Sequence, residues 1–175
     1  PVAGRMNVLR GVNESVIIDD SYNSSPLAAI AALKTLYAIP TDQRIAILGS
    51  MNELGAYSEQ AHHEVGEACN TAKLDWVVTV GKDAEQYLAP EARKRGCQVK
   101  SFQTAFEAGG FVHSLIRKGG VVLVKGSQND VFTEEATKVL LHDSEDESQL
   151  VRQSPEWMKM KRNFFDHVNG ASEEV

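Results

Sequence analysis

The stretch from Val16 to Pro26, VIIDDSYNSSP, decides the fold of this chain. Its first three residues are branched and apolar, as in a buried strand, and Asp19 and Asp20 stand where that strand would end. Ser25 and Pro26 then form a helix-start signal. A serine hydroxyl can accept an unpaired backbone N–H, and the fixed φ of proline suits the first helical turn. The stretch therefore predicts a strand, a polar turn and a helix.

The same alternation continues along the chain. Strand-like apolar runs lie at 6–10, 14–19, 44–48, 76–80, 98–102 and 121–124, and helical patterns lie at 27–36, 58–73, 84–95, 104–118 and 133–141. Strands that alternate with helices of this length indicate a parallel sheet with right-handed crossovers. The predicted fold class is therefore α/β, a Rossmann-like three-layer sandwich. Its mostly parallel sheet has about five or six strands, and the first two runs form an edge hairpin.

Composition narrows the class of protein. With 175 residues, 42% of them hydrophobic, the chain can bury the core of one ordinary globular domain. The net charge of -6 argues against nucleic acid as the main partner, because phosphate backbones require a basic face. No apolar run is long enough for a membrane span. The two cysteines, Cys69 and Cys97, lack metal-ligand spacing and indicate reduced, buried thiols of a cytoplasmic protein.

The C-terminal part has a different composition. Residues 1–142 form the predicted domain, and 143–175 form an acidic linker with a short helical tail. Pro155 to Phe165 carries enough large apolar residues for a helix that docks on the domain or on a partner. The chain begins at Pro1 without a start Met, and we interpret it as a piece of a longer protein.

Three loops follow predicted strands, at 19–25, 49–55 and 125–129. In open α/β sheets, ligands bind at the carboxyl ends of the strands, so these loops together predict one cleft. The first loop would place Asp20, Tyr22 and Asn23 at the ligand-facing edge. Asp20 could hold ribose hydroxyls or order the water shell of a cation, whereas its neighbour Asp19 is expected to cap the next turn.

The other two loops contain further candidates. Lys125 would emerge at the rim of the sheet, where it could hold a phosphate or remain a solvated lysine. Glu53 could polarise a substrate amine or cap the following helix, on which His62 looks back toward the loop. The sequence contains no Walker loop, since Lys125-Gly126-Ser127 lacks the glycine-rich part that precedes it in P-loops.

The order of these blocks resembles the C-terminal domain of the Mur ligases. The blocks are GRM at 4–6, IDDSYNSSP at 18–26, LGSMNELG at 48–55 with a histidine seven residues later, and LVKGS at 123–127. The resemblance covers about residues 4–141. It is strongest to the type that adds D-alanyl-D-alanine to UDP-N-acetylmuramoyl-tripeptide, mainly because of Ser21-Tyr22-Asn23 in the first loop.

The resemblance implies a cytoplasmic, ATP-dependent amide-bond ligase of peptidoglycan synthesis with three domains. The N-terminal domain would bind the UDP sugar, and the central domain would carry the P-loop and hold Mg²⁺. ATP would phosphorylate the peptide carboxylate, and the dipeptide amine would displace phosphate. The C-terminal domain would swing in, present the dipeptide and complete the ATP site, which excludes water from the acyl phosphate.

The resemblance also assigns residues to the two sides of that site. Arg5 would reach an ATP phosphate and Asp20 the ribose or adjacent groups, and Tyr22 and Asn23 would line the nucleotide side. The dipeptide side would be formed by Glu53, His62, Lys125 and Ser127. No residue is assigned to catalysis or to a metal in this part of the enzyme.

Four positions depart from the family pattern. Ser25 stands where asparagine is typical, Ser50 replaces an aspartate, and Asn52 replaces an apolar residue. Gln128 stands where arginine is usual, which would weaken a contact with the dipeptide carboxylate unless Lys125 or Arg5 substitutes. These changes bear on the identity of the acceptor.

Two other functions remain open from the sequence. One is a related ligase with another acceptor, of the folylpolyglutamate or cyanophycin synthase type. The other is a stand-alone, non-catalytic module that binds a nucleotide or a partner, with the aromatic C-terminal segment as its docking helix. Upstream sequence would discriminate between them, because a P-loop before Pro1 supports a ligase and a start codon near Pro1 supports the module.

Overall fold

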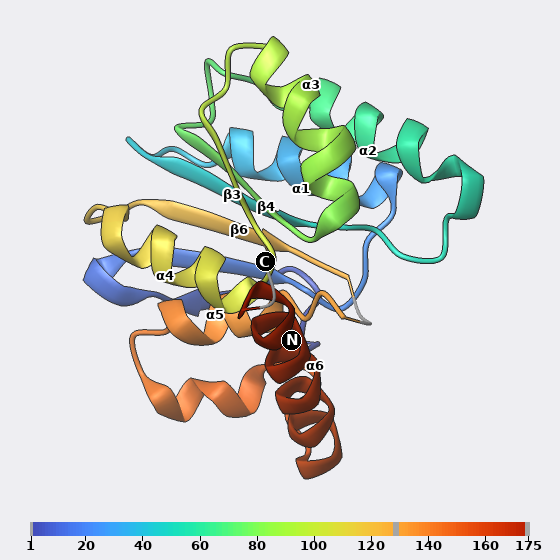
Figure 1. Ribbon diagram of the computed structural model, residues 1–175. Coiled ribbons are helices and arrows are strands. Elements are labelled where there is room, and N and C mark those ends of the chain that lie inside the picture. Colours follow the sequence, from blue (N-terminus) through green and yellow to red (C-terminus); the bar gives the residue numbers. More distant parts are fainter. Residues whose placement is uncertain (1, 128–129, 174–175) are drawn as a thin grey trace.

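The computed structural model describes residues 2–127 and 130–173, and it has one sheet between layers of helices (Figure 1). The strands are β1 (Asn7–Arg10), β2 (Val16–Asp20), β3 (Arg44–Gly49), β4 (Trp76–Val80), β5 (Val99–Phe102) and β6 (Val121–Lys125). Their order in the sheet is β1-β2-β6-β3-β4-β5. Only β1 is antiparallel to its neighbour within this sheet, so the predicted α/β class and the predicted edge hairpin are confirmed.

The helices are α1 (Pro26–Ala38), α2 (Ser58–Glu67), α3 (Ala89–Lys94), α4 (Ala105–Leu115), α5 (Glu134–Leu140) and α6 (Pro155–Glu173). Helices α1, α2 and α3 bury their apolar faces in one core, and α4 and α5 bury theirs in a second core on the opposite face of the sheet. The side chains of successive strand residues point into opposite cores. Ile18 belongs to the first and Ile17 to the second, as expected for side chains that alternate across a strand.

Strand order brings the three predicted loops together. β6 lies between β2 and β3, and all three run in parallel, so their carboxyl ends meet at one edge of the sheet. The register pairs Asp20 with Lys125 across β2 and β6, and Lys125 with Leu48 across β6 and β3. The topology therefore places the loops after β2, β3 and β6 side by side, as the sequence predicted.

Two helical segments differ from their predicted form. α2 ends at Glu67 rather than near residue 73, and Asn70 then organises a turn in which its side chain accepts the Ala72 N–H and its carbonyl accepts the N–H of Leu74. The predicted helix at 84–95 starts with a π-helical turn, Ala84–Leu88, before α3 continues it.

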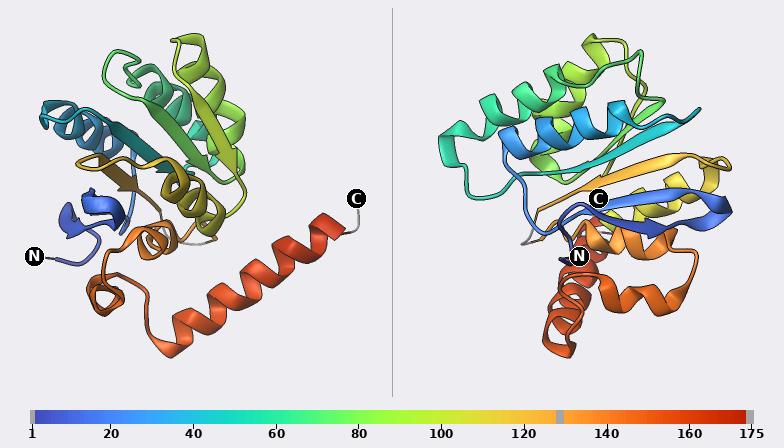
Figure 2. Two further views of the ribbon diagram at one scale, coloured as in Figure 1. Left: turned by 90° about the vertical axis from the view of Figure 1, so that its left-hand side faces the viewer. Right: turned by 180° about the vertical axis from the view of Figure 1, so that it is seen from behind.

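The C-terminal segment leaves the domain and returns to it. A 3₁₀ turn at Ser144–Gln149 occupies the predicted linker, and α6 is longer than the predicted short helix, with 19 residues. Figure 2 shows α6 lying outside the two helical layers. In the described part of the chain, no helix is both long and apolar enough to span a bilayer.

Candidate functional site

A crevice of about 230 Å³ lies at the carboxyl ends of β2 and β6. Its lining includes Arg5, Asp20, Tyr22, Asn23 and Lys125. These five residues come from three separate parts of the sequence, namely the segment before β1, the end of β2 with its loop, and the end of β6. The structure thus brings all four residues predicted for the nucleotide side into one place, together with one that was predicted for the dipeptide side.

Asp20 and Lys125 form a salt bridge at the base of this crevice. Lys125 Nζ lies 3.1 Å from Asp20 Oδ2, and Asp20 Oδ1 accepts the backbone N–H of Met6 at 3.1 Å. Burial lowers the pKa of Lys125, and the Asp20 carboxylate opposes this effect, whereas the Arg5 charge adds to it. Lys125 is 4% exposed, so it is neither a solvated lysine nor a cation that projects from the rim.

Lys125 also holds the loop that follows β2. Its ammonium donates hydrogen bonds to the backbone carbonyls of Asp20 and Asn23. A lysine ammonium has three protons, and here it has three oxygen partners, namely the Asp20 carboxylate and the two carbonyls. In this structure, therefore, Lys125 shapes the crevice through Asp20 and Asn23.

The mouth of the crevice carries an exposed cation. Arg5 is exposed, and its guanidinium carbon lies 4.4 Å from the centre of the Tyr22 ring, within the range of a cation–π interaction. Tyr22 is 42% exposed, and its backbone N–H donates to the carbonyl of Gly4 at 2.9 Å. This backbone bond sets the segment before β1 beside the loop after β2, so Arg5 and Tyr22 are positioned as a pair.

The loop ends in the helix start that the sequence predicted. Ser25 is the N-cap of α1, and its Oγ accepts the N–H of Ala28 at 3.2 Å, with Pro26 in the first turn. A serine at the position where asparagine is typical therefore still caps the helix.

The loop after β3 does not line this crevice, although the sequence predicted one cleft for all three loops. Glu53 is exposed and has a positive φ of 62°, and it does not line the crevice. His62, in contrast, is fully buried. Its Nε2 accepts the N–H of Met51 at 2.9 Å, and its Nδ1 lies 2.7 Å from the carbonyl oxygen of Ser58.

These contacts define the state of His62. Nδ1 carries the proton that it donates to Ser58, and Nε2 stays unprotonated as the acceptor from Met51, so the ring is neutral. Burial lowers its pKa, while the contact with the Ser58 carbonyl and the charge of Asp83 act in the opposite direction. His62 therefore fixes the loop that carries Glu53, and both ring nitrogens are already engaged.

Two other residues that the sequence analysis singled out, Ser127 and Ser50, are buried. Ser127 is fully buried directly after β6. Ser50 is also buried, and it donates to the carbonyl of Val80 and accepts the N–H of Ala84, so it ties the end of β3 to the start of the π turn. Gln128, the position where arginine is usual, lies outside the described residues.

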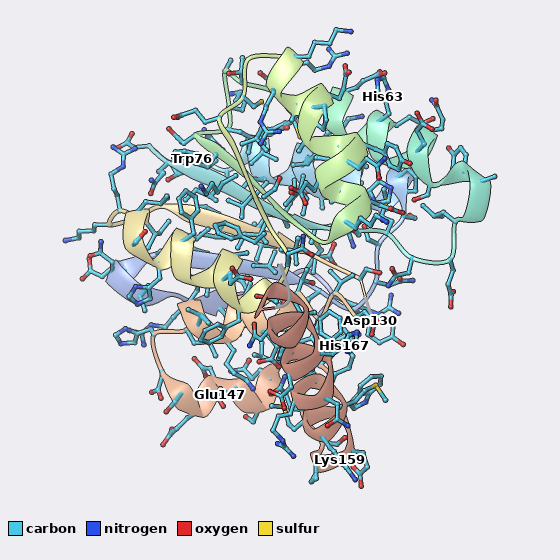
Figure 3. The ribbon with its side chains drawn as sticks, in the orientation of Figure 1. His63, Trp76, Asp130, Glu147, Lys159 and His167 are labelled. Carbon is cyan, nitrogen blue, oxygen red and sulfur yellow. The ribbon has the colours of Figure 1, made fainter. Side chains whose placement is uncertain are left out.

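A second crevice, of about 350 Å³, lies beside the first along the same edge of the sheet. The loops after β3, β4 and β5 contribute Asn52, Lys82 and Gln103, and Phe164 of α6 forms part of its wall. Figure 3 shows Asp130, which also lines it, beside the C-terminal half of α6. The sequence analysis missed this crevice because it depends on α6, whose docking position has no sequence signal.

Two further features lie away from this edge. A groove of about 460 Å³ runs between α1 and the end of α2 and contains no predicted site residue. On α2 and α3, His63, Glu67 and Glu91 are close enough together for each to offer one ligand atom to a metal ion. Arg95 already pairs with Glu91 at 3.2 Å, so this group is explained as a surface ion-pair network.

A comparison with known protein families identifies the family of this chain. The family described as "Mur ligase, glutamate ligase domain" matches residues 4–128. The chain belongs to the Mur ligase family. A UDP-N-acetylmuramoyl-tripeptide--D-alanyl-D-alanine ligase of Escherichia coli is 39% identical over 83 residues, which are 47% of this chain and 18% of that protein.

Solved structures of Mur ligases agree with this assignment. MurF from Acinetobacter baumannii has a TM-score of 0.65 and 31% identity, covering 78% of this chain and 29% of that one. MurF from Thermotoga maritima in complex with ADP has a TM-score of 0.62 and 28% identity, covering 79% of this chain and 32% of that one. The chain thus spans less than a third of the length of these relatives.

Proposed function

We propose that this chain is the C-terminal domain of an ATP-dependent ligase that adds D-alanyl-D-alanine to UDP-N-acetylmuramoyl-tripeptide in the cytoplasm. The support is the family match over residues 4–128, together with relatives of that name and Mur ligase structures of the same fold. Its partners would be the N-terminal and central domains of the same protein, with the P-loop and the Mg²⁺ site in the central domain.

The nucleotide side of the proposed site is the crevice between β2 and β6. Arg5 is exposed and cationic, and it would neutralise negative charge on a phosphate, which is the main requirement of phosphoryl transfer. Asp20 uses one oxygen for Lys125 and one for the N–H of Met6. A carboxylate has about four lone-pair sites, so Asp20 can still accept a ribose hydroxyl.

The size of this crevice supports a shared site. At about 230 Å³ it lies below the usual range of complete small-molecule pockets, which is about 300–1,000 Å³. It would therefore enclose only part of a nucleotide, and another domain would enclose the rest. Domain closure would bring these residues to the nucleotide and exclude water from the reacting carboxylate.

The dipeptide side of the proposed site is the loop after β3 and its neighbours. Glu53 is an exposed carboxylate, and it would accept a hydrogen bond from the amine of the dipeptide. His62, Lys125 and Ser127 are buried, so they would act by holding the loops in position.

The test is turnover by the full-length protein with ATP, Mg²⁺, UDP-N-acetylmuramoyl-tripeptide and D-alanyl-D-alanine. We expect phosphate release that requires the dipeptide, and no turnover from residues 1–175 alone, because the proposed P-loop lies in another domain. A full-length protein that ignores D-alanyl-D-alanine but accepts glutamate or another amine would show that the acceptor is wrong. The absence of any amine-dependent phosphate release would contradict the ligase itself.

A further inference from the structure

The C-terminal segment reaches the loop that forms the nucleotide-side crevice. Arg152 is buried, and its Nε and Nη2 each lie 2.7 Å from one carboxylate oxygen of Glu134, the first residue of α5. The same guanidinium donates to two backbone carbonyls, Nη2 to Ser21 at 2.7 Å and Nη1 to Tyr22 at 3.1 Å. One side chain thus joins the tail, α5 and the loop after β2.

A second cation from the tail completes this network. Lys161 of α6 is 1% exposed, and its ammonium lies 2.6 Å from Glu135 and 3.0 Å from Glu134. It also donates to the backbone carbonyl of Arg152 at 2.7 Å. Burial alone would raise the pKa of Glu135, but the hydrogen bond and charge of Lys161, together with the charge of Lys138 and a hydrogen bond from Gln153, lower it. The two buried carboxylates therefore each have a charged partner from the tail.

The Val151 side chain of the tail packs on the segment before β1, whose Gly4 carbonyl accepts the N–H of Tyr22 in the loop. Gly4 lies so close to Val151 that a Cβ at Gly4 would come within 2.8 Å of Val151 Cγ1. Arg152 itself has a positive φ of 54°, a conformation that residues other than glycine adopt only where surrounding contacts impose it. The bonds to Glu134, Ser21 and Tyr22 supply those contacts.

Together, two buried cations hold every carbonyl of the loop from Asp20 to Asn23. Lys125 of the sheet binds the first and last of these carbonyls, and Arg152 of the tail binds the two between them. The peptide planes determine where Tyr22 and Asn23 project into the crevice. Lys125 and Arg152 thus act on one set of four peptide groups.

We propose that Arg152 is a positioning residue for the nucleotide-side loop, and that the tail after residue 142 acts on the nucleotide site through this one side chain. The nucleotide part of this inference rests on the proposed function. Arg152 lies beyond residues 4–128, so the family match does not include it. Arg152 acts through the carbonyls of Ser21 and Tyr22, and it does not itself line the crevice.

The chain offers a matched control for the test. Arg152 and Lys161 are both buried and both pair with Glu134, but in the described structure only Arg152 contacts the loop. In the full-length protein, Arg152→Met and Lys161→Met should both lower the melting temperature. Only Arg152→Met should weaken binding of a non-hydrolysable ATP analogue, by about tenfold, since loop hydrogen bonds are lost. Lys161→Met should stay within about twofold when measured below both melting temperatures.

Amide hydrogen exchange tests the positioning role without any ligand. Exchange at residues 21–23 should accelerate in Arg152→Met and not in Lys161→Met. Arg152→Lys, which can pair with Glu134 but lacks the planar fork for two carbonyls, should give an intermediate rate and serves if Arg152→Met does not fold. Equal exchange and equal nucleotide affinity in the Arg152 and Lys161 variants would overturn the inference. A wild-type protein that binds no nucleotide but shows the exchange difference would contradict the proposed function and retain the loop clamp.

Discussion

At the scale of single residues, Asp19 and Asp20 show how adjacent carboxylates acquire different roles. Successive strand residues point to opposite faces, so Asp20 meets Lys125 while Asp19 points toward α5. Asp19 Oδ1 accepts the hydroxyl of Thr137 at 3.2 Å, and among the described residues Oδ2 has no hydrogen-bond partner. Asp19 therefore connects α5 to β2. The sequence analysis predicted that it would cap the next turn, and this prediction is wrong.

Burial raises the pKa of Asp19 from 3.8 to about 6, and the hydrogen bond from the Thr137 hydroxyl only partly opposes this effect. In this interval the folded state binds more protons than the unfolded state. Stability should therefore fall as the pH rises from about 4 to about 6, by on the order of 3 kcal/mol. Asp19→Asn should remove most of this decline, because the amide remains uncharged.

The measurement is the free energy of unfolding in urea between pH 4 and 7. Asp42→Asn, at an exposed turn, is the control and should retain the wild-type slope. Identical slopes in the wild type and Asp19→Asn would show that Asp19 is ionised to the same extent in the folded and unfolded states.

Sequence analysis predicted which residues meet at the crevice better than it predicted the exposure of Lys125 and His62. Arg5, Asp20, Tyr22 and Asn23 meet because strand order alone brings their segments together. Whether a lysine or histidine is exposed depends on neighbours from distant segments. Lys125 is buried by the loop after β2, and His62 by the loop after β3, and neither contact leaves a periodic pattern in the sequence.

At the scale of elements, two adjacent glycines in α4 should respond in opposite ways to the same substitution. A Cβ at Gly109 would lie 3.0 Å from the backbone of Ala136 on α5, whereas nothing lies within 4 Å of a Cβ at Gly110. Gly110→Ala should stabilise the protein by about 0.5–1 kcal/mol through helix propensity. Gly109→Ala should destabilise it by about 1–3 kcal/mol, because it pushes α5 away.

Equilibrium unfolding of both variants checks this difference, and each serves as the control for the other. If Gly109→Ala proved as stabilising as Gly110→Ala, then α4 and α5 would not be in close contact. Such a result would also question the position of α5, which carries Glu134 and Thr137.

The first residues of the helices were largely predictable, because a helix N-cap depends on residues that are close in the sequence. Ser25 with Pro26 starts α1 as expected, and the hydroxyl of Thr104 accepts the N–H of Glu107 at the start of α4. The Glu107 carboxylate in turn accepts the Thr104 hydroxyl at 2.9 Å. The end of α2 could not be predicted, because the turn at Asn70 depends on the contact of its N–H with Tyr37 on α1.

At the scale of the whole molecule, the alternation of strands and helices predicted the fold class, and strand order then fixed where the loops meet. The sequence predicted a C-terminal helix that docks on the domain or on a partner, and in the structure Trp157 and Phe164 of this helix contact Phe132 of the domain. The ionic contacts made by Arg152 and Lys161 could not be predicted. These residues have no apolar pattern, and in a sequence they resemble solvated surface charges. The division at residue 142 remains a prediction, although α6 and the domain share this buried ionic network.

The central claim is that the crevice between β2 and β6 forms the nucleotide side of a ligase site. Calorimetric titration of a non-hydrolysable ATP analogue into the full-length protein tests it, with Arg5→Gln compared with Arg10→Gln. Both arginines are exposed, but only Arg5 lines the crevice. We predict affinity at least about tenfold weaker for Arg5→Gln and unchanged for Arg10→Gln. Equal affinities in the two variants would contradict the claim.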